Sequence, residues 1–220
     1  MNTDQAKQAA AEAAVALVTD GMVVGLGTGS TAKFAVAALG RRMREGLRFI
    51  GIPTSEATAN QALALGIPLA TLVEYPSVSL TIDGADEIEA HTLGLIKGRG
   101  GALLREKMIA AVSERLLIIA DVSKLVDRLG ATVPVPVEVV PFGWQSTARR
   151  LEQLGARATL RESFTTDGGH LILDCAFGVI ADPDALARRI DSVVGVVEHG
   201  LFLRMATSAF IASEVGVKRY

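Results

Sequence analysis

Short apolar runs alternate with segments of helical periodicity along the first part of the chain. Apolar strands are expected at 22–26, 47–52, 79–82 and 115–120, and helices at 4–18, 31–44, 55–65 and 101–114. Strands that alternate with helices favour a mostly parallel sheet covered by helices on both faces. This part of the chain is therefore predicted to form an open, doubly wound, Rossmann-like α/β domain.

The pattern changes after a proline-rich stretch at 134–141. Strands are expected at 137–140, 156–160, 170–177 and 195–203, and helices at 144–154 and after Asp182. This βαββαβ order is typical of a ferredoxin-like α+β unit, and the last residues of the chain are expected to return to the first domain. We therefore predict a Rossmann-like catalytic domain of residues 1–130 and 205–220, with a smaller ferredoxin-like domain of residues 131–204 inserted into it.

Composition excludes several classes of function. The 220 residues carry a formal net charge of −2, so the chain lacks the broad basic field that nucleic-acid or anionic-membrane binding needs. No apolar run reaches the length of a membrane span. The single cysteine, Cys175, excludes an intrachain disulfide, fits a reducing compartment and is expected to be buried in a strand. We expect a cytoplasmic protein.

A glycine-rich turn, Gly25–Thr31, lies between the first predicted strand and the following helix. Glycine turns present backbone N–H groups, and a helix N-terminus adds partial positive charge, so such a turn suits a phosphate group. A dinucleotide-binding loop has the same context, but its usual spacing is G-x-G-x-x-G and its usual ribose-binding acid is absent after Ile52. A tight turn without a ligand is the third interpretation.

Two carboxylates, Asp83 and Asp86, follow the third predicted strand. Open α/β sheets bind ligands at the carboxyl ends of their strands. These side chains could cap a turn, bind a metal, or bond sugar hydroxyls and relay protons. No other oxygen-rich loop is evident, which argues against a metal.

A second glycine turn, Lys97–Gly101, opens the helix that contains Glu106. The ordinary role of a carboxylate in a first helical turn is to complement the helix dipole. Its occurrence beside two anion-binding turns and two aspartates favours a catalytic base instead. Lys124 follows the next strand and is either a surface residue or a ligand contact. The three histidines, His91, His170 and His199, have no metal-ligand spacing.

The segments GLGTGSTA, DGADEI and KGRGGALLREK, in this order and at these intervals, closely resemble type A ribose-5-phosphate isomerase. IADVSK, PVEVVP, TDGGHLILD and GVVEHGLF extend the similarity through nearly the whole chain. The resemblance implies the fold predicted above, a sugar-phosphate substrate, activity without metal or cofactor, and a homodimer or homotetramer. The implied reaction is the reversible conversion of D-ribose 5-phosphate to D-ribulose 5-phosphate in the non-oxidative branch of the pentose phosphate pathway.

The resemblance also implies site residues at three segments. They are Thr28, Gly29, Ser30 and Thr31, then Asp83, Gly84, Ala85 and Asp86, then Lys97, Gly98, Arg99 and Gly100. Glu106 is implied as the proton acceptor and Lys124 as a substrate contact. We expect an enediolate mechanism in which Asp83 or Asp86 shuttles hydroxyl protons and Lys97 stabilises the developing charge.

The sequence departs from the family pattern at two places. Arg99 stands where many members have glycine, so its side chain must point away from the ligand or add a contact. The tail at 212–217 lacks an expected Pro-Asp-Gly turn. Two other functions are compatible with the same turns: a sugar-phosphate-sensing module and an NAD-linked oxidoreductase.

Overall fold

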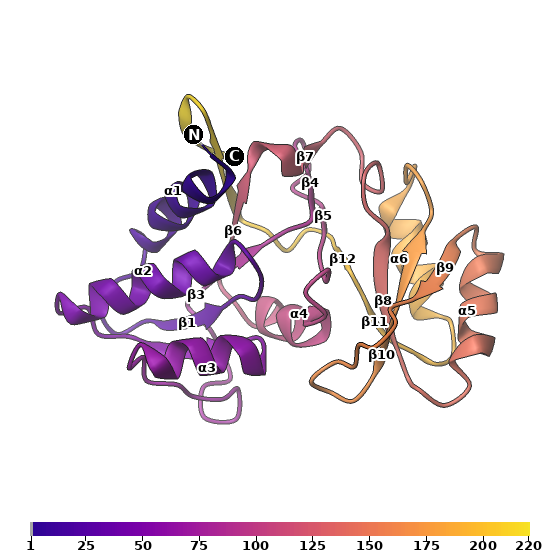
Figure 1. Cartoon of the computed structure of the whole chain (residues 1–220), viewed down its shortest axis with the longest axis horizontal. Helices are drawn as coiled ribbons and strands as arrows, with labels where there is room; N and C mark the ends of the chain where they lie inside the picture. The colour runs from indigo at the N-terminus through magenta and orange to yellow at the C-terminus, as the bar shows by residue number, and fades with distance from the viewer. Residues whose placement is uncertain (1) are drawn as a thin grey trace. The chain divides into compact units, whose positions relative to one another are not determined.

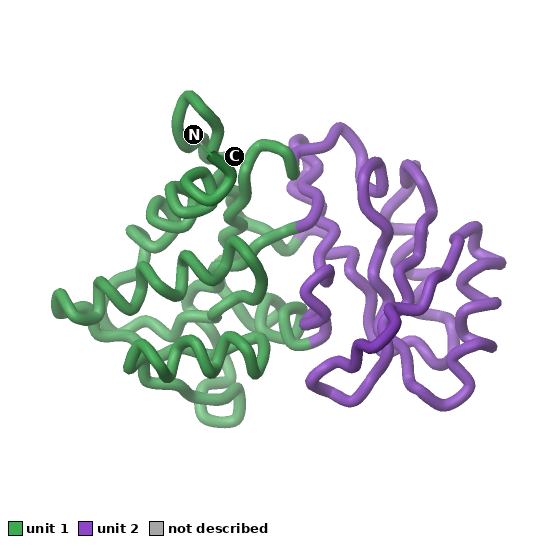
Figure 2. Tube along the Cα trace, in the orientation of Figure 1, with its two compact units in different colours: residues 1–85, 105–124, 205–220 green, residues 86–104, 125–204 purple. Residues whose placement is uncertain are grey.

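The computed structural model describes residues 2–220 and divides them into two compact units (Figures 1 and 2). Unit 1, green in Figure 2, contains the chain up to Ala85 together with Arg105–Lys124 and Met205–Tyr220. Unit 2, purple in the same figure, contains Asp86–Leu104 and Leu125–Arg204. Each unit has its own sheet and its own hydrophobic core.

Unit 1 is built on a six-stranded sheet of order β14-β13-β6-β3-β1-β2. Its strands are β1 (Val23–Leu26), β2 (Ile50–Pro53), β3 (Leu80–Gly84), β6 (Leu116–Asp121), β13 (Ser208–Ser213) and β14 (Gly216–Arg219). All neighbours pair in parallel except β13 and β14. The predicted Rossmann-like, mostly parallel sheet is confirmed, and the C-terminal residues return to it as expected.

Helices cover both faces of this sheet. They are α1 (Thr3–Val15), α2 (Ala32–Arg44), α3 (Glu56–Ala64) and α4 (Leu103–Ala111). Residues of α1, α2 and α3 pack with Val24 and Leu26 in one core, while Ile109 of α4 packs near Val23 in another. Alternate residues of β1 therefore face opposite helical layers, as a doubly wound sheet requires.

Local signals set the helix starts. The side chain of Ser55 accepts a hydrogen bond from the N–H of Thr58, and Asp182 accepts one from the N–H of Ala185. Ser and Asp are common at this position because their side chains satisfy N–H groups that the helix leaves unpaired. The C-terminal tail turns through a two-residue connection between Ser213 and Gly216, and Gly216 takes a φ of +122° in place of a Pro-Asp-Gly turn.

Unit 2 contains an antiparallel sheet of order β11-β8-β10-β9. Its elements are β8 (Val135–Val139), α5 (Trp144–Gln153), β9 (Arg157–Leu160), β10 (Leu171–Ala176), α6 (Pro183–Asp191) and β11 (Val196–His199). Helices α5 and α6 pack on one sheet face in a common core. The predicted ferredoxin-like arrangement is confirmed.

Cys175 lies in the core of unit 2, as expected for a strand cysteine. It is fully buried in β10. Burial, followed by the nearby charges of Asp174 and Glu152, raises the pKa of its thiol to about 12. The thiol is therefore protonated at neutral pH and unsuited to nucleophilic chemistry.

A small sheet of order β12-β5-β4-β7 also belongs to unit 2, and the sequence analysis did not anticipate it. Its strands are β4 (Glu87–Glu89), β5 (Leu95–Ile96), β7 (Leu125–Val126) and β12 (Leu201–Phe202). Glu87 is buried, and its carboxylate accepts N–H groups of Gly130, Thr132 and Val133. Residues 86–104 and 125–130 therefore join unit 2, whereas the predicted boundary assigned them to the first domain.

Strands of two or three residues are too short to produce a hydrophobic period, which is why this sheet escaped prediction. Among residues 2–220, no helix combines the length and the apolar character needed to cross a lipid bilayer.

Candidate active site

The first glycine turn follows β1 in unit 1 and packs directly on the end of β3. The N–H of Gly27 donates to the carbonyl of Ile82 at 3.0 Å. A Cβ atom at Gly27 would lie 2.2 Å from Asp83 Oδ1 and 2.6 Å from Asp83 Cα. Only glycine permits this approach, so the turn and Asp83 are held together by backbone packing.

The N-terminal end of α2 offers backbone donors to an anion. Gly29 has a φ of +114°, a left-handed conformation that glycine adopts without strain. Within residues 2–220, the N–H groups of Gly29, Ser30 and Thr31 have no acceptor, and Thr31 makes no side-chain cap. Unsatisfied N–H groups at a helix N-terminus attract phosphate. These N–H groups belong to the turn where the sequence predicts a phosphate site.

Lys7 of α1 lies at the same turn, although the sequence analysis did not select it. Its ammonium donates to Ser30 Oγ at 3.2 Å, and its side chain is 15% exposed. Asp4 lies at the edge of ion-pair range, 4.0 Å away. Lys7 precedes Ser30 by 23 residues, and no local motif connects the two. Only the packing of α1 beside α2 brings this cation to the turn.

The hydroxyl of Thr28 is directed toward the start of α3. Its Oγ1 lies 2.6 Å from Thr54 Oγ1, 2.7 Å from Ser55 Oγ and 3.0 Å from Thr58 Oγ1. Thr54 and Thr58 donate to the carbonyls of Leu26 and Gly27. Within the described chain, the hydroxyl of Thr28 therefore forms its hydrogen bonds with side chains at the start of α3, and these bonds stabilise the conformation of the turn.

Asp83 ends the buried part of β3 and is 1% exposed. Its Oδ1 accepts the N–H of Thr28 at 3.2 Å and that of Gly84 at 2.7 Å. Gly84 and Ala85 continue from Asp83 at the same edge, as the predicted site requires.

Glu106 lies in the first turn of α4 and is 3% exposed. The other end of this helix is fixed near the start of β3, because Ser113 Oγ lies 2.7 Å from Thr81 Oγ1. Ile109 packs against Gly25 of β1, where a Cβ would lie 2.8 Å from its Cγ2 atom. Glu106 lies about one turn from Ile109 toward the N-terminus of the same helix.

Lys124 also belongs to this edge of unit 1. It ends the short 3-10 helix η1 (Val122–Lys124), which follows β6 directly. The N–H of Ser123 donates to Asp121 at 3.0 Å, so the turn after the strand is fixed by its own residues. The lysine itself is half-buried.

In unit 2, Asp86 and Lys97 are held on the small sheet. The N–H of Asp86 donates to the carbonyl of Ile96 at 2.8 Å, and the N–H of Lys97 donates to that of Gly200 at 2.8 Å. Lys97 is 2% exposed, with its ammonium 5.4 Å from the ring centre of Phe202. A cation in this position over an aromatic face is attracted by the negative face of the ring.

The second glycine turn has two residues with positive φ, Gly98 at +105° and Gly101 at +77°. The N–H of Gly101 donates back to the carbonyl of Gly98 at 2.9 Å, which closes the turn. The N–H of Arg99 donates to Asp86 Oδ2 at 3.0 Å. The turn and Asp86 are thus one hydrogen-bonded group, as their predicted common role requires.

Arg99, which departs from the family pattern, is exposed. Within residues 2–220 its guanidinium group makes no hydrogen bond or ion pair. It lines a cavity of about 450 Å³ in unit 2. The other lining residues are Asp86, Thr132, Val133, Pro134, Pro136, Arg161 and Asp174. Arg99 therefore adds a cation to the wall of a cavity that Asp86 also lines.

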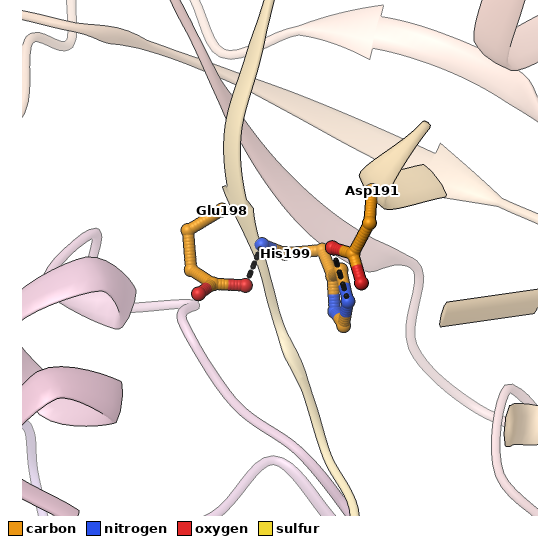
Figure 3. Close-up of side chains that lie close together, drawn as sticks. All are labelled: Asp191, Glu198 and His199. Carbon is orange, nitrogen blue, oxygen red and sulfur yellow. Dashed lines mark hydrogen bonds and ion pairs between the residues drawn. The ribbon is translucent and has the colours of Figure 1, made fainter. Parts of the chain in front are cut away.

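Among residues 2–220, one cluster of side chains has the composition of possible metal ligands (Figure 3). It comprises Asp191, Glu198 and His199. Nδ1 of His199 accepts the N–H of Leu201, so the ring proton is assigned to Nε2, which donates to Asp191 at 3.2 Å. Figure 3 shows Asp191 turned toward the imidazole and Glu198 on the other side of the strand, where it accepts the N–H of His199. The three side chains already form hydrogen bonds within the protein, so we interpret the cluster as structural.

Comparison with known proteins decides the family. The sequence model of the protein family ribose 5-phosphate isomerase A (phosphoriboisomerase A) matches residues 50–216. The ribose-5-phosphate isomerase A of Gloeobacter violaceus is 61% identical, across 99% of this chain and 96% of its own length. The chain belongs to the ribose 5-phosphate isomerase A family. The relative from Thermomicrobium roseum is 55% identical, across 99% of this chain and 94% of its own length.

Solved structures of ribose 5-phosphate isomerases have the same fold. The enzyme from Methanocaldococcus jannaschii superposes with a TM-score of 0.95 at 41% identity, covering 99% of this chain and 98% of that chain. A D-ribose-5-phosphate isomerase in complex with phospho-erythronic acid gives a TM-score of 0.97 at 36% identity, covering 100% of this chain and 99% of that chain. Family membership confirms the resemblance predicted from the motifs and removes the support for a dinucleotide-binding protein.

Proposed function

We propose that this member of the ribose 5-phosphate isomerase A family interconverts D-ribose 5-phosphate and D-ribulose 5-phosphate, with Glu106 as the base. The observation that carries the proposal is the buried carboxylate of Glu106 in α4, a helix that packs on β1 through Ile109 and Gly25 within unit 1. Isomerisation of an aldose to a ketose needs one group that removes a proton beside a carbonyl and returns it to the neighbouring carbon.

The phosphate is held by the first glycine turn in this proposal. The unsatisfied N–H groups of Gly29, Ser30 and Thr31 supply directed donors, and Lys7 supplies a full positive charge. Lys124, at the end of the 3-10 helix that follows β6, contributes a second cation. Thr28 supports the turn through its hydroxyl contacts and donates its N–H to Asp83.

The chemical steps follow from the groups available. Asp83 or Asp86 accepts and returns a hydroxyl proton as the furanose ring opens. Glu106 removes the proton from C2, the electrons move to the carbonyl oxygen at C1, and an enediolate forms. The C2 hydroxyl proton then passes to the C1 oxygen, and protonation at C1 by Glu106 gives the ketose. Lys97 and the Gly100 N–H of the second glycine turn stabilise the negative charge, each donor being worth about 3 kcal/mol in comparable sites.

The direct test is the formation of ribulose 5-phosphate from ribose 5-phosphate by the purified protein in excess chelator. We expect full activity there, because the residues proposed for each step are amino, carboxyl and backbone groups. Absence of turnover in buffer would contradict the proposed function. Turnover that is lost with chelator and restored by a divalent cation would contradict the cofactor-free mechanism.

Replacement of Lys7 tests the phosphate site. Lys7→Ala is expected to raise KM for ribose 5-phosphate about tenfold or more, since a hydrogen bond to a charged group contributes about 1.5–3 kcal/mol. We expect a smaller change in kcat, because Lys7 contacts the turn and not the reacting carbons. Lys218→Ala removes an equal charge from the exposed strand β14 and should leave both constants unchanged. An unchanged KM in Lys7→Ala would remove this residue from the phosphate site.

We further propose that the protein works in the cytoplasm as a homodimer or homotetramer. A single buried cysteine and the absence, within residues 2–220, of a helix able to cross a bilayer are compatible with the cytoplasmic proposal. The oligomer is the state that the family resemblance implies.

A further inference from the structure

Arg161 makes an unusual set of contacts within unit 2. It follows β9, and its guanidinium group forms a two-bond pair with the Asp174 carboxylate, at 3.0 Å from Nε and 2.6 Å from Nη2. The third nitrogen, Nη1, donates to the carbonyl of Gly98 at 3.2 Å and to that of Arg99 at 3.0 Å. Both carbonyls belong to the second glycine turn. Arg161 therefore joins β10 to two successive peptide groups of that turn.

Holding these carbonyls also sets the direction of two N–H groups. In a trans peptide the C=O and the following N–H point in opposite directions. With the Gly98 carbonyl on Arg161, the N–H of Arg99 points away from it, and this N–H donates to Asp86 Oδ2 at 3.0 Å. With the Arg99 carbonyl on Arg161, the N–H of Gly100 likewise points away from the guanidinium. Within residues 2–220 this N–H has no acceptor.

A second contact holds the far end of the turn. The guanidinium carbon of Arg161 lies 5.5 Å from the ring centre of Phe164. That ring packs on Gly101, where a Cβ atom would lie 2.0 Å from Phe164 Cζ. A glycine turn without these contacts has many accessible conformations, since glycine adopts either sign of φ. Arg161 and Phe164 together restrict it to one.

We propose that Arg161, oriented by Asp174, is a positioning residue that aims the Gly100 N–H of the second glycine turn for stabilisation of the enediolate, while it holds the Arg99 N–H on Asp86. This inference rests on the proposed function. Preorganised donors act without a reorganisation cost when charge develops, so their aim affects the transition state more than the bound substrate. In this proposal neither Arg161 nor Asp174 touches the substrate.

The pair has the chemistry that such a role needs. A guanidinium group has five donors in a planar fork, so it can pair with a carboxylate and still donate to two carbonyls. Lysine cannot do both at once. Arg161→Lys therefore keeps the charge beside Asp174 while loosening the turn, and Asp174→Asn keeps the guanidinium while weakening its orientation.

Steady-state kinetics of these variants test the inference. For Arg161→Lys and Arg161→Ala we expect kcat to fall about 10- to 100-fold, with KM for ribose 5-phosphate nearly unchanged. This is less than the roughly 10²- to 10³-fold for removal of a donor, because the N–H group stays and only its orientation is lost. Affinity for 4-phosphoerythronate, whose carboxylate resembles the enediolate oxygens, should fall in parallel with kcat/KM. Asp174→Asn should show a smaller loss of the same kind. Arg157→Ala removes an exposed arginine from the same strand and should behave as the wild-type protein.

Chemical rescue separates a positioning role from a merely structural one. Arg161 lines the cavity of about 450 Å³ described above, so a small cation can reach its place. Millimolar ethylguanidinium should restore much of kcat in Arg161→Ala and none in Glu106→Gln. If Arg161→Ala fails to fold, the kinetics and the 4-phosphoerythronate affinity of Arg161→Lys and Asp174→Asn test the inference instead.

Wild-type kcat and wild-type 4-phosphoerythronate affinity in the folded Arg161→Lys and Asp174→Asn variants would overturn the inference while leaving the proposed function intact. The inference would also be overturned if KM for ribose 5-phosphate rose in parallel with the loss of kcat in these variants while their affinity for 4-phosphoerythronate stayed unchanged. An inactive wild-type protein would overturn the proposed function and this inference with it.

Discussion

Glu106→Gln is expected to lower kcat for ribose 5-phosphate isomerisation by at least about 10³-fold, because an amide cannot accept the C2 proton. Glutamine has nearly the same shape, so binding of ribose 5-phosphate should persist and be measurable by calorimetry. The carboxylate is almost fully buried in the first turn of α4, so bulk water does not replace it easily as the base. Among the single substitutions considered for this protein, we expect this one to have the largest effect on rate.

Exchange of the C2 hydrogen with solvent deuterium gives a second measurement of the same step. Glu106→Gln should abolish exchange at C2 as well as turnover, since both need removal of the same proton. Glu114→Gln makes the same chemical change at an exposed residue just beyond α4 and should leave both rates unchanged. Wild-type exchange in Glu106→Gln would show that another group removes the proton.

Gly27→Ala is expected to lower both stability and activity. The added methyl group would meet Asp83 at 2.2 Å from Oδ1 and 2.6 Å from Cα, so the turn and β3 must move apart. Overpacking of this kind costs about 1–3 kcal/mol in free energy of unfolding. In a chain of this size, each kcal/mol shifts the melting temperature by about 2–4 °C. Activity should fall further than stability implies, because Asp83 and the phosphate turn are displaced together.

Gly84→Ala is the matched control for stability. Gly84 follows Asp83 at the end of β3. A Cβ atom at Gly84 would lie 3.8 Å from Thr31 Cβ, which is an ordinary contact, and the φ of Gly84 is not positive. The same methyl group should therefore cost little free energy of unfolding at this position. Equal melting temperatures for the two variants would contradict the close packing of Gly27 on Asp83.

Much of the fold could be predicted because its signals are local. The helix caps at Ser55 and Asp182 and the glycine turns depend on residues a few positions apart, so they leave a readable pattern. The carboxyl edge of a parallel sheet then brought Asp83 and the first glycine turn together by topology alone. The residues in the small sheet had no such signal, since their strands are two or three residues long.

The sequence by itself determined the alternation that makes a parallel sheet, the two glycine turns and the carboxylates that follow them. Only the tertiary structure placed Lys7 on Ser30, 23 residues away, and Arg161 on Gly98, 63 residues away. It also directed the hydroxyl of Thr28 to Ser55 at the start of α3. Local conformation depends on neighbours along the chain, whereas these contacts depend on how whole helices and strands pack, which no short pattern encodes.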